Sequence, residues 1–259
     1  MPVHVHHADA GRGLPLVLLH GFPLSSAMWV PQRRALADVC RVITPDQRGF
    51  GRSPLGDDAP SLEYVVDDLA ALLDRLGLDR VVLGGLSMGG YVAMRFSARY
   101  PERVAGLVLV DTKATADPPE VLDRRELVAR RMLEPGGAEA LARELVPGMV
   151  GRTTREERPE VLRQLGDLVR AAPPESIAWG SRAMAARPDS LDVLATMSVP
   201  ALVVVGEEDE LTPPSDAEAM VDVLPDARLV RIPRAGHMSS LEDPEVFDAA
   251  VRHFVTGLH

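Results

Sequence analysis

A serine at position 87 lies among four glycines in the stretch from Gly84 to Tyr91, "GGLSMGGY". Residues 85 to 89 fit the pattern G-x-S-x-G, which here follows an apolar run and precedes an amphipathic one. This context is typical of a strand-to-helix turn so sharp that only small residues fit two positions before and two after the serine. The pattern therefore predicts an exposed Ser87 hydroxyl that can attack a carbonyl carbon.

The same glycines do not fit either of the common phosphate-binding motifs. A dinucleotide fingerprint needs a glycine two positions after the first, and neither Gly84 nor Gly85 has one. A P-loop needs a lysine directly after its last glycine, where this chain has Gly90. The remaining alternative to a nucleophile is a structural turn in which Ser87 does no chemistry.

A serine hydroxyl is a weak nucleophile until a base takes its proton, and an acid must orient that base. The base is expected to be His237, in the loop after the last apolar run, where the carboxyl edge of a parallel sheet would lie. His20 follows the first long apolar run and is expected to support its loop. Five histidines in a predicted N-terminal edge strand, or in or after the final helix, are set aside: His4, His6, His7, His253 and His259.

The orienting acid is expected just past another strand, in "VVVGEEDELTPP". Asp209 is the preferred residue and Glu207 the second choice. The order Ser87, Asp209, His237 is the order of nucleophile, acid and histidine in enzymes whose nucleophilic serine lies at a strand-to-helix turn. Acyl transfer also needs N–H donors for the developing oxyanion. The backbone N–H groups of Met88, beside the nucleophile, and of Phe22, in "HGFPLSSAMW", are the candidates.

The elements that must position these residues follow from hydrophobic periodicity. Continuous apolar runs at 14–20, 40–46, 80–85, 104–111, 200–209 and 227–233 alternate with helical patterns at 61–78, 87–101, 213–225 and 243–258. Such alternation predicts an α/β fold whose parallel sheet is covered on both faces. Residues 117–190 contain no strand pattern. We therefore expect a core of residues 1–116 and 191–259, with an all-helical cap inserted at 117–190.

Composition excludes several functional classes. The formal net charge is −10 and aromatic residues are 4 % of the chain, which disfavours nucleic acid and acidic membranes as partners. The single cysteine, Cys40, forbids an intrachain disulfide, and no signal peptide or membrane-spanning apolar run is visible. We expect a cytoplasmic protein that uses no cofactor and no metal.

Taken together, these motifs resemble the α/β-hydrolase fold superfamily. The resemblance is carried by "HGFP" (20–23), "DQRGFGRS" (46–53), "GLSMG" (85–89), "GEED" (206–209) and Gly236-His237. It implies a mostly parallel eight-stranded sheet with helices on both faces and a helical cap after the sixth strand. It also implies that Ser87 is the nucleophile, His237 the base and Asp209 its orienting acid, with Phe22 and Met88 as oxyanion donors. Loop 46–53 is similar to a structural loop of the family.

Two narrower resemblances suggest the reaction. "HGFPLSSAMW" is similar to cofactor-free haloperoxidases and perhydrolase-like esterases, and "GLSMGG" to ketoadipate enol-lactonases and small carboxylesterases. A serine at position 87 disfavours dehalogenases and epoxide hydrolases, which carry aspartate there. We expect a serine hydrolase that cleaves small carboxylic esters or lactones through an acyl-enzyme. A perhydrolase or haloperoxidase, a C–C bond hydrolase or lyase, and a catalytically silent binding protein remain alternatives.

An apolar acyl pocket is expected beside the nucleophile, because apolar residues flank the proposed catalytic positions. Leu211 and Met238 are the expected lining residues from the core. Trp179, an isolated tryptophan in a polar helix, is the expected one from the cap. No fixed charge is expected inside the pocket, although a cap arginine such as Arg124 or Arg130 could reach an anionic substrate.

Overall fold

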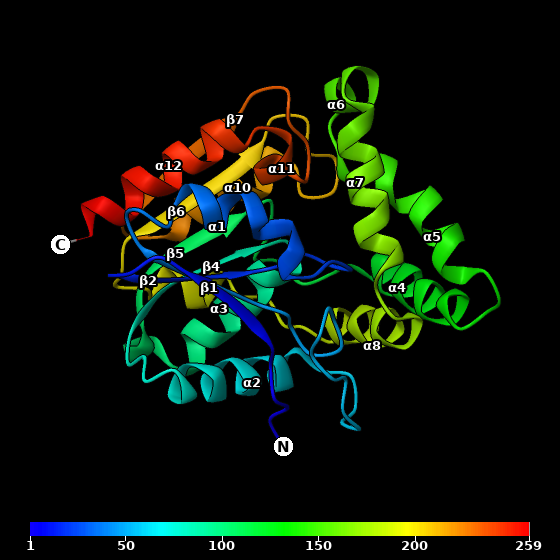
Figure 1. Cartoon of the computed structure of the whole chain (residues 1–259), viewed down its shortest axis with the longest axis horizontal. Helices are drawn as coiled ribbons and strands as arrows, with labels where there is room; N and C mark the ends of the chain where they lie inside the picture. The colour runs from blue at the N-terminus through cyan, green and yellow to red at the C-terminus, as the bar shows by residue number, and fades with distance from the viewer. Residues whose placement is uncertain (259) are drawn as a thin grey trace.

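A seven-stranded sheet with helices on both faces forms the centre of the molecule in the computed structural model, which describes residues 1–258 (Figure 1). His259, one of the histidines set aside above, lies outside the described residues. The strand order is β1-β3-β2-β4-β5-β6-β7, and every neighbouring pair is parallel except β1 with β3. The strands are β1 (His7–Ala10), β2 (Pro15–Leu19), β3 (Arg41–Pro45), β4 (Val81–Leu86), β5 (Val104–Val110), β6 (Ala201–Gly206) and β7 (Ala227–Ile232).

The α/β class predicted from the sequence is confirmed, with one strand fewer than the resemblance implied. The expected edge strand at the N-terminus begins only at His7. The N–H groups of the residues before it donate to side chains, that of Val3 to Asp68 and that of His6 to Ser53, while the His6 carbonyl accepts from the Asp46 N–H. The antiparallel β1 therefore ends the sheet at that edge.

Burial on both faces explains why the strands are continuously apolar. Val17 and Leu19 of β2 belong to one apolar cluster, and Leu16 and Leu18 to a second. The first cluster includes residues of α2 (Leu62–Arg75), α3 (Met88–Arg99) and α10 (Pro214–Val223). The second includes Met28, Trp29 and Leu36, on either side of α1 (Val30–Ala35), and residues of α12 (Pro244–Gly257). Because neither face meets water, the strands show no polar alternation.

Among the helices on the sheet, the four longest begin and end near the positions that the sequence predicted, and the others were not predicted. The helices on the sheet are η1 (Ser26–Trp29), α1 (Val30–Ala35), α2 (Leu62–Arg75), α3 (Met88–Arg99), η2 (Pro101–Arg103), α9 (Leu191–Ala195), α10 (Pro214–Val223), α11 (Ser239–Glu242) and α12 (Pro244–Gly257), where η denotes a 3-10 helix. Ser61 caps α2 by accepting from the Glu63 N–H, and Asp243 caps α12 by accepting from the Val246 N–H. In residues 1–258, no helix combines the length and the apolar character needed to span a bilayer.

Between β5 and β6 the chain leaves the sheet and forms a separate group of helices, to the right in Figure 1. They are α4 (Pro119–Met132), α5 (Gly137–Leu145), η3 (Val146–Met149), α6 (Arg152–Glu157), α7 (Pro159–Arg170) and α8 (Pro174–Ala185). The breaks between these helices fall at the proline and glycine clusters of the sequence. We call residues 117–190 the helical segment.

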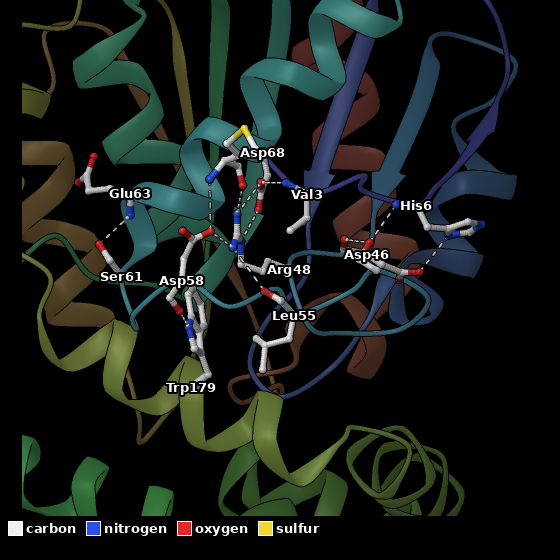
Figure 2. A network of polar contacts seen from close by, with 12 residues as sticks. Val3, His6, Asp46, Arg48, Leu55, Asp58, Ser61, Glu63, Asp68 and Trp179 are labelled. Carbon is white, nitrogen blue, oxygen red and sulfur yellow. Dashed lines mark hydrogen bonds and ion pairs between the residues drawn. The ribbon is translucent and has the colours of Figure 1, made fainter.

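A buried ion-pair network joins this segment to the core (Figure 2). The Arg48 side chain is fully buried and donates to both carboxylate oxygens of Asp68 on α2, at 2.7 and 2.9 Å. It also donates to the Asp58 carboxylate at 2.8 Å. The Trp179 indole on α8 donates to the Asp58 carbonyl at 2.9 Å. Loop 46–53, which the resemblance marked as structural, therefore anchors both α2 and α8.

Removing the charge of Asp68 is expected to destabilise the protein strongly, because it leaves the buried Arg48 guanidinium with Asp58 as its single carboxylate partner. Breaking a buried ion pair costs roughly 3–5 kcal/mol, and we expect Asp68→Asn to fall near the lower limit, about 3 kcal/mol. Urea-induced unfolding measures this. The matched control is Glu63→Gln on the same helix, which breaks exposed pairs with Arg95 and Arg99 and should cost less than about 1 kcal/mol. Equal losses of unfolding free energy in Asp68→Asn and Glu63→Gln would contradict a buried, stabilising Arg48–Asp68 pair.

Candidate active site

Ser87 lies at the turn between β4 and α3, with φ 52° and ψ −112°. A positive φ is strained for serine and persists only where the surroundings enforce it. A Cβ atom on Gly85 would overlap the carbonyl group of Gly89, and one on Gly89 would overlap the carbonyl group of Leu19. The two glycines of G-x-S-x-G are thus required by close backbone approach, as the sequence predicted.

His237 and Asp209 lie together at the carboxyl edge of the sheet. The His237 Nδ1 atom is 2.9 Å from Asp209 Oδ2, and both side chains are buried. Because a carboxylate only accepts, Nδ1 carries the proton and Nε2 remains available as a base. Ser87 and His237 line the same cavity, whose volume is about 370 Å³. The structure therefore brings the three predicted residues to one place, while the second choice, Glu207, is exposed.

The Asp209 carboxylate is held by three residues. Besides the histidine it accepts the hydroxyl of Thr212 at 2.7 Å and the backbone N–H groups of Leu211 and Thr212 at 2.8 and 3.0 Å. Burial opposes its ionisation, but these donors and the His237 ring outweigh burial and lower its pKa. Sequence reasoning missed Thr212. The signal was a hydroxyl residue three positions after an acid in a loop, which is typical of a local side-chain bond.

Two further buried acids surround His237, and both were missed. Asp111 follows β5 and accepts from the Ser239 hydroxyl at 2.6 Å and from the Gly206 N–H at 2.9 Å. Asp111 lies just past a strand, which is the same sequence signal from which Asp209 was predicted. Burial, and next the Asp209 charge, raises the Asp111 pKa well above its usual range. For His237, burial opposes protonation, but Asp209, Asp111 and Glu242 together raise the pKa above 6.5.

Glu242 connects the histidine loop to the helical segment. One of its carboxylate oxygens accepts the N–H groups of Gly236 and Met238, at 2.9 and 3.2 Å. The other accepts the N–H of Gly151, at the start of α6, at 2.9 Å. The Glu242 carbonyl accepts from Arg158, also in the helical segment. The backbone on both sides of His237 is therefore fixed by one carboxylate.

The loop after β2 lies beside Ser87, and Phe22 from this loop lines the cavity. His20 Nδ1 donates to the Gly21 carbonyl at 2.9 Å, and His20 Nε2 accepts from the Gln47 N–H at 2.9 Å. Burial lowers the pKa of His20 to about 4, so the ring is neutral and serves this loop as a hydrogen-bonding group. Helix α3 begins at Met88, where the first N–H groups lack helical acceptors.

Of the three residues expected to line an acyl pocket, the structure places only Leu211 there. Met238 is fully buried in the core cluster that includes α12. Trp179 points from α8 towards Asp58 (Figure 2), and it is not among the residues that line the cavity. The cavity is also more charged than expected: Lys113, Asp117, Arg124, Arg125 and Arg131 all line it, whereas Arg130 is exposed and pairs with Glu126.

No set of three or more histidine, cysteine, aspartate or glutamate side chains suited to a metal ion occurs within the described residues. The site instead combines a strained serine, a histidine with one free nitrogen and a buried carboxylate at the carboxyl edge of a parallel sheet. This arrangement defines a class of hydrolases built on an α/β sheet.

Comparison with known proteins agrees. A family model described as "alpha/beta hydrolase fold" matches residues 15–244, and the chain belongs to this family as a hydrolase. A thermophilic esterase from Thermogutta terrifontis, solved with malate bound, is 44 % identical; the match covers 98 % of this chain and 94 % of that one, with TM-score 0.95.

Two further relatives have different named activities. The enol-lactonase from Burkholderia xenovorans LB400 is 30 % identical over 97 % of this chain and 96 % of its own, with TM-score 0.88. A pimeloyl-[acyl-carrier protein] methyl ester esterase from Aeromonas hydrophila is 30 % identical over 95 % of this chain and 96 % of its own.

Replacing Glu242 by glutamine is expected to loosen the histidine loop, because one accepting oxygen becomes an amide donor. A buried N–H left without an acceptor costs about 1–3 kcal/mol of stability. The lost charge also lowers the pKa of His237, so the acid limb of the pH–rate profile for aryl ester hydrolysis should move to lower pH. Urea unfolding and the pH–rate profile measure the two effects.

The control for this change is Glu208→Gln. Glu208 also holds the helical segment, through Thr153, but makes none of the bonds to residues 236–238. This variant should leave the acid limb where it is. An unshifted acid limb in Glu242→Gln would contradict the proposed effect of the Glu242 charge on the pKa of His237.

Proposed function

We propose that the protein is a serine hydrolase that cleaves small carboxylic esters or lactones through an acyl-enzyme. The Ser87 hydroxyl attacks the carbonyl carbon while His237 Nε2 takes its proton. Asp209 accepts from Nδ1–H and stabilises the charged ring. His237 then protonates the leaving alcohol, and a water molecule deprotonated by the same nitrogen releases the acid. The observation that carries the proposal is the His237–Asp209 bond beside the strained Ser87.

The oxyanion of each tetrahedral intermediate is bound, in this proposal, by the backbone N–H groups of Phe22 and Met88. The start of α3 supports the second donor, because a helix N-terminus favours negative charge. The bonds of His20 to its loop support the first, because they fix the backbone on which Phe22 lies. Donors held in this way need no reorganisation when charge develops.

We further propose that residues 117–190 act as a cap over a core of residues 1–116 and 191–259. Met149 and Met184 from this segment line the cavity with Ser87 and His237, which supports the assignment. Relatives named as an esterase and an enol-lactonase support the ester and lactone substrates. A small-molecule substrate in the cytoplasm, with neither nucleic acid nor membrane as partner, completes the proposal.

Ser87→Ala is expected to lower hydrolysis of p-nitrophenyl acetate by at least about 10⁴-fold, because the acyl-enzyme cannot form. A fluorophosphonate should label the unmodified protein and not this variant. Retention of full esterase activity in Ser87→Ala would contradict the mechanism. Peracid formation from acetate and hydrogen peroxide that exceeds ester hydrolysis in the unmodified protein would instead favour the perhydrolase alternative.

The pH dependence follows from the raised pKa of His237. The base must be neutral, so kcat/KM should fall as the pH drops through a value above 6.5, the ordinary histidine pKa. Asp209→Asn removes the largest charge that raises this pKa, so its acid limb should lie at lower pH. The same change should reduce kcat by about 10³-fold or more, since the histidine loses its orienting acceptor. An acid limb that does not move in Asp209→Asn would contradict the assignment of Asp209 as the acid that orients His237 and raises its pKa.

A further inference from the structure

One buried carboxylate in the cavity faces three cationic side chains. Asp117, at the start of the helical segment, pairs with Arg187 through two contacts, at 2.7 and 2.9 Å. It also accepts from Arg125 Nε, and Lys113 Nζ lies 3.2 Å from its Oδ1. Burial opposes ionisation of Asp117, but the arginines keep its pKa far below the usual range. One negative charge therefore meets three positive charges, and two positive charges remain unbalanced.

Arg187 alone accounts for the structural role of this cluster. It lies near the end of the helical segment, and it donates to Asp117, to the Thr115 carbonyl and to the Met184 carbonyl. These bonds connect the beginning of the segment to its end. Lys113 and Arg125 are not needed for that connection. Both line the cavity, and their side chains are 16 % and 17 % exposed.

The cluster lies close to the proposed nucleophile. The Thr112 hydroxyl donates to the Ser87 carbonyl at 2.8 Å, and Lys113 is the next residue. Tyr91, one helical turn after Ser87, lines the cavity and stacks under the Arg187 guanidinium, which is 4.0 Å from the ring centroid. Ser87, Lys113 and Arg125 line one cavity, so a substrate whose carbonyl carbon meets Ser87 can extend within that cavity towards Lys113 and Arg125.

The other charges at the cavity do not cancel this excess. Arg131 pairs with Glu144, and Glu210 lies 3.6 Å from Arg155. Arg124 also lines the cavity and adds a further positive charge. Asp216 on α10 interacts with Lys113 from outside the cavity lining and offsets part of its charge, whereas Arg125 has no such second acidic neighbour among its ion pairs within the described residues. Partly buried cations are screened less by salt than exposed ones, so they attract an anion even when salt is present.

From this geometry we infer that Lys113 and Arg125 form a carboxylate-binding subsite, and that the preferred substrates are esters or lactones carrying a carboxylate besides the reacting carbonyl. This inference rests on the proposed function and narrows it to one substrate class. The carboxylate would take the two unbalanced positive charges, with Lys113 as a point donor and Arg125 offering its N–H groups.

The test compares two substrates of the same shape, monomethyl glutarate and methyl glutaramate, in which an amide replaces the carboxylate. Acid release in a pH-stat gives kcat/KM for each. We expect the unmodified protein to prefer the carboxylate by about 10-fold or more, since a charged hydrogen bond contributes that much. Lys113→Gln and Arg125→Gln should bring this ratio towards one, chiefly by lowering kcat/KM for the carboxylate ester, because the positive charge that binds the carboxylate is lost.

Two control variants separate charge from structure. Lys113→Arg keeps the positive charge and should keep the preference. Arg130→Gln removes an exposed arginine of the same helix as Arg125 that does not line the cavity, and it should leave the ratio largely unchanged. A thermal melt checks that each variant is folded, and Lys113→Gln tests the subsite without disturbing the Arg187 connection.

Each outcome decides the inference. Equal rates on the two substrates in the unmodified protein, or an unchanged ratio in both Lys113→Gln and Arg125→Gln, would overturn it. If the subsite fails in this way but the unmodified protein hydrolyses methyl glutaramate and Ser87→Ala does not, the proposed function stands without the subsite. If neither ester is cleaved in a Ser87-dependent way, the proposed function itself fails.

Discussion

The close approach of β4 and α3 at Ser87 is the constraint on which the rest of the site depends. The helix can begin directly after the strand only because Gly85 and Gly89 have no side chains to separate the two backbones. Ser87 is then held at a positive φ, and its carbonyl accepts from Gly90, Tyr91 and Thr112. Since β4 is the central strand of the sheet, its carboxyl end meets loops from both sides.

Burial of several acids around one histidine is the main electrostatic feature of this site. Such acids are costly unless each is hydrogen-bonded, and here each one is. Asp209 is held by Thr212, Asp111 by Ser239 and Gly206, and Glu242 by backbone N–H groups. The acids therefore have two effects. They fix the loops that carry His237, and they favour the protonated form of its ring, which the reaction must create.

Local patterns in the sequence predicted most of the fold and the residues that meet at the candidate site. Ser87, Asp209 and His237 each lie in the turn or loop that follows a parallel strand, so the carboxyl edge of the sheet gathers them however the distant parts pack. Trp179 and Met238 were misplaced because their environment is set by long-range packing. The indole of Trp179 meets a carbonyl 121 positions away, and no periodicity of its helix encodes that contact. The extended N-terminus likewise depends on side chains of α2 and loop 46–53.

The expectation of an uncharged pocket failed for a related reason, and the failure has functional meaning. The two ends of the helical segment lie side by side where it joins the core, and Asp117 at the first end pairs with Arg187 near the second. Asp117 is ionised there although burial alone would oppose its ionisation. Arg187 suffices to balance that charge. The chain nevertheless adds Lys113, its only lysine, and Arg125 on the side that faces the cavity. In a molecule of net charge −10, two surplus cations beside the proposed nucleophile create a local field opposite to that of the whole protein. An entering anion meets that field at short range, where the distant surface charges are screened by salt.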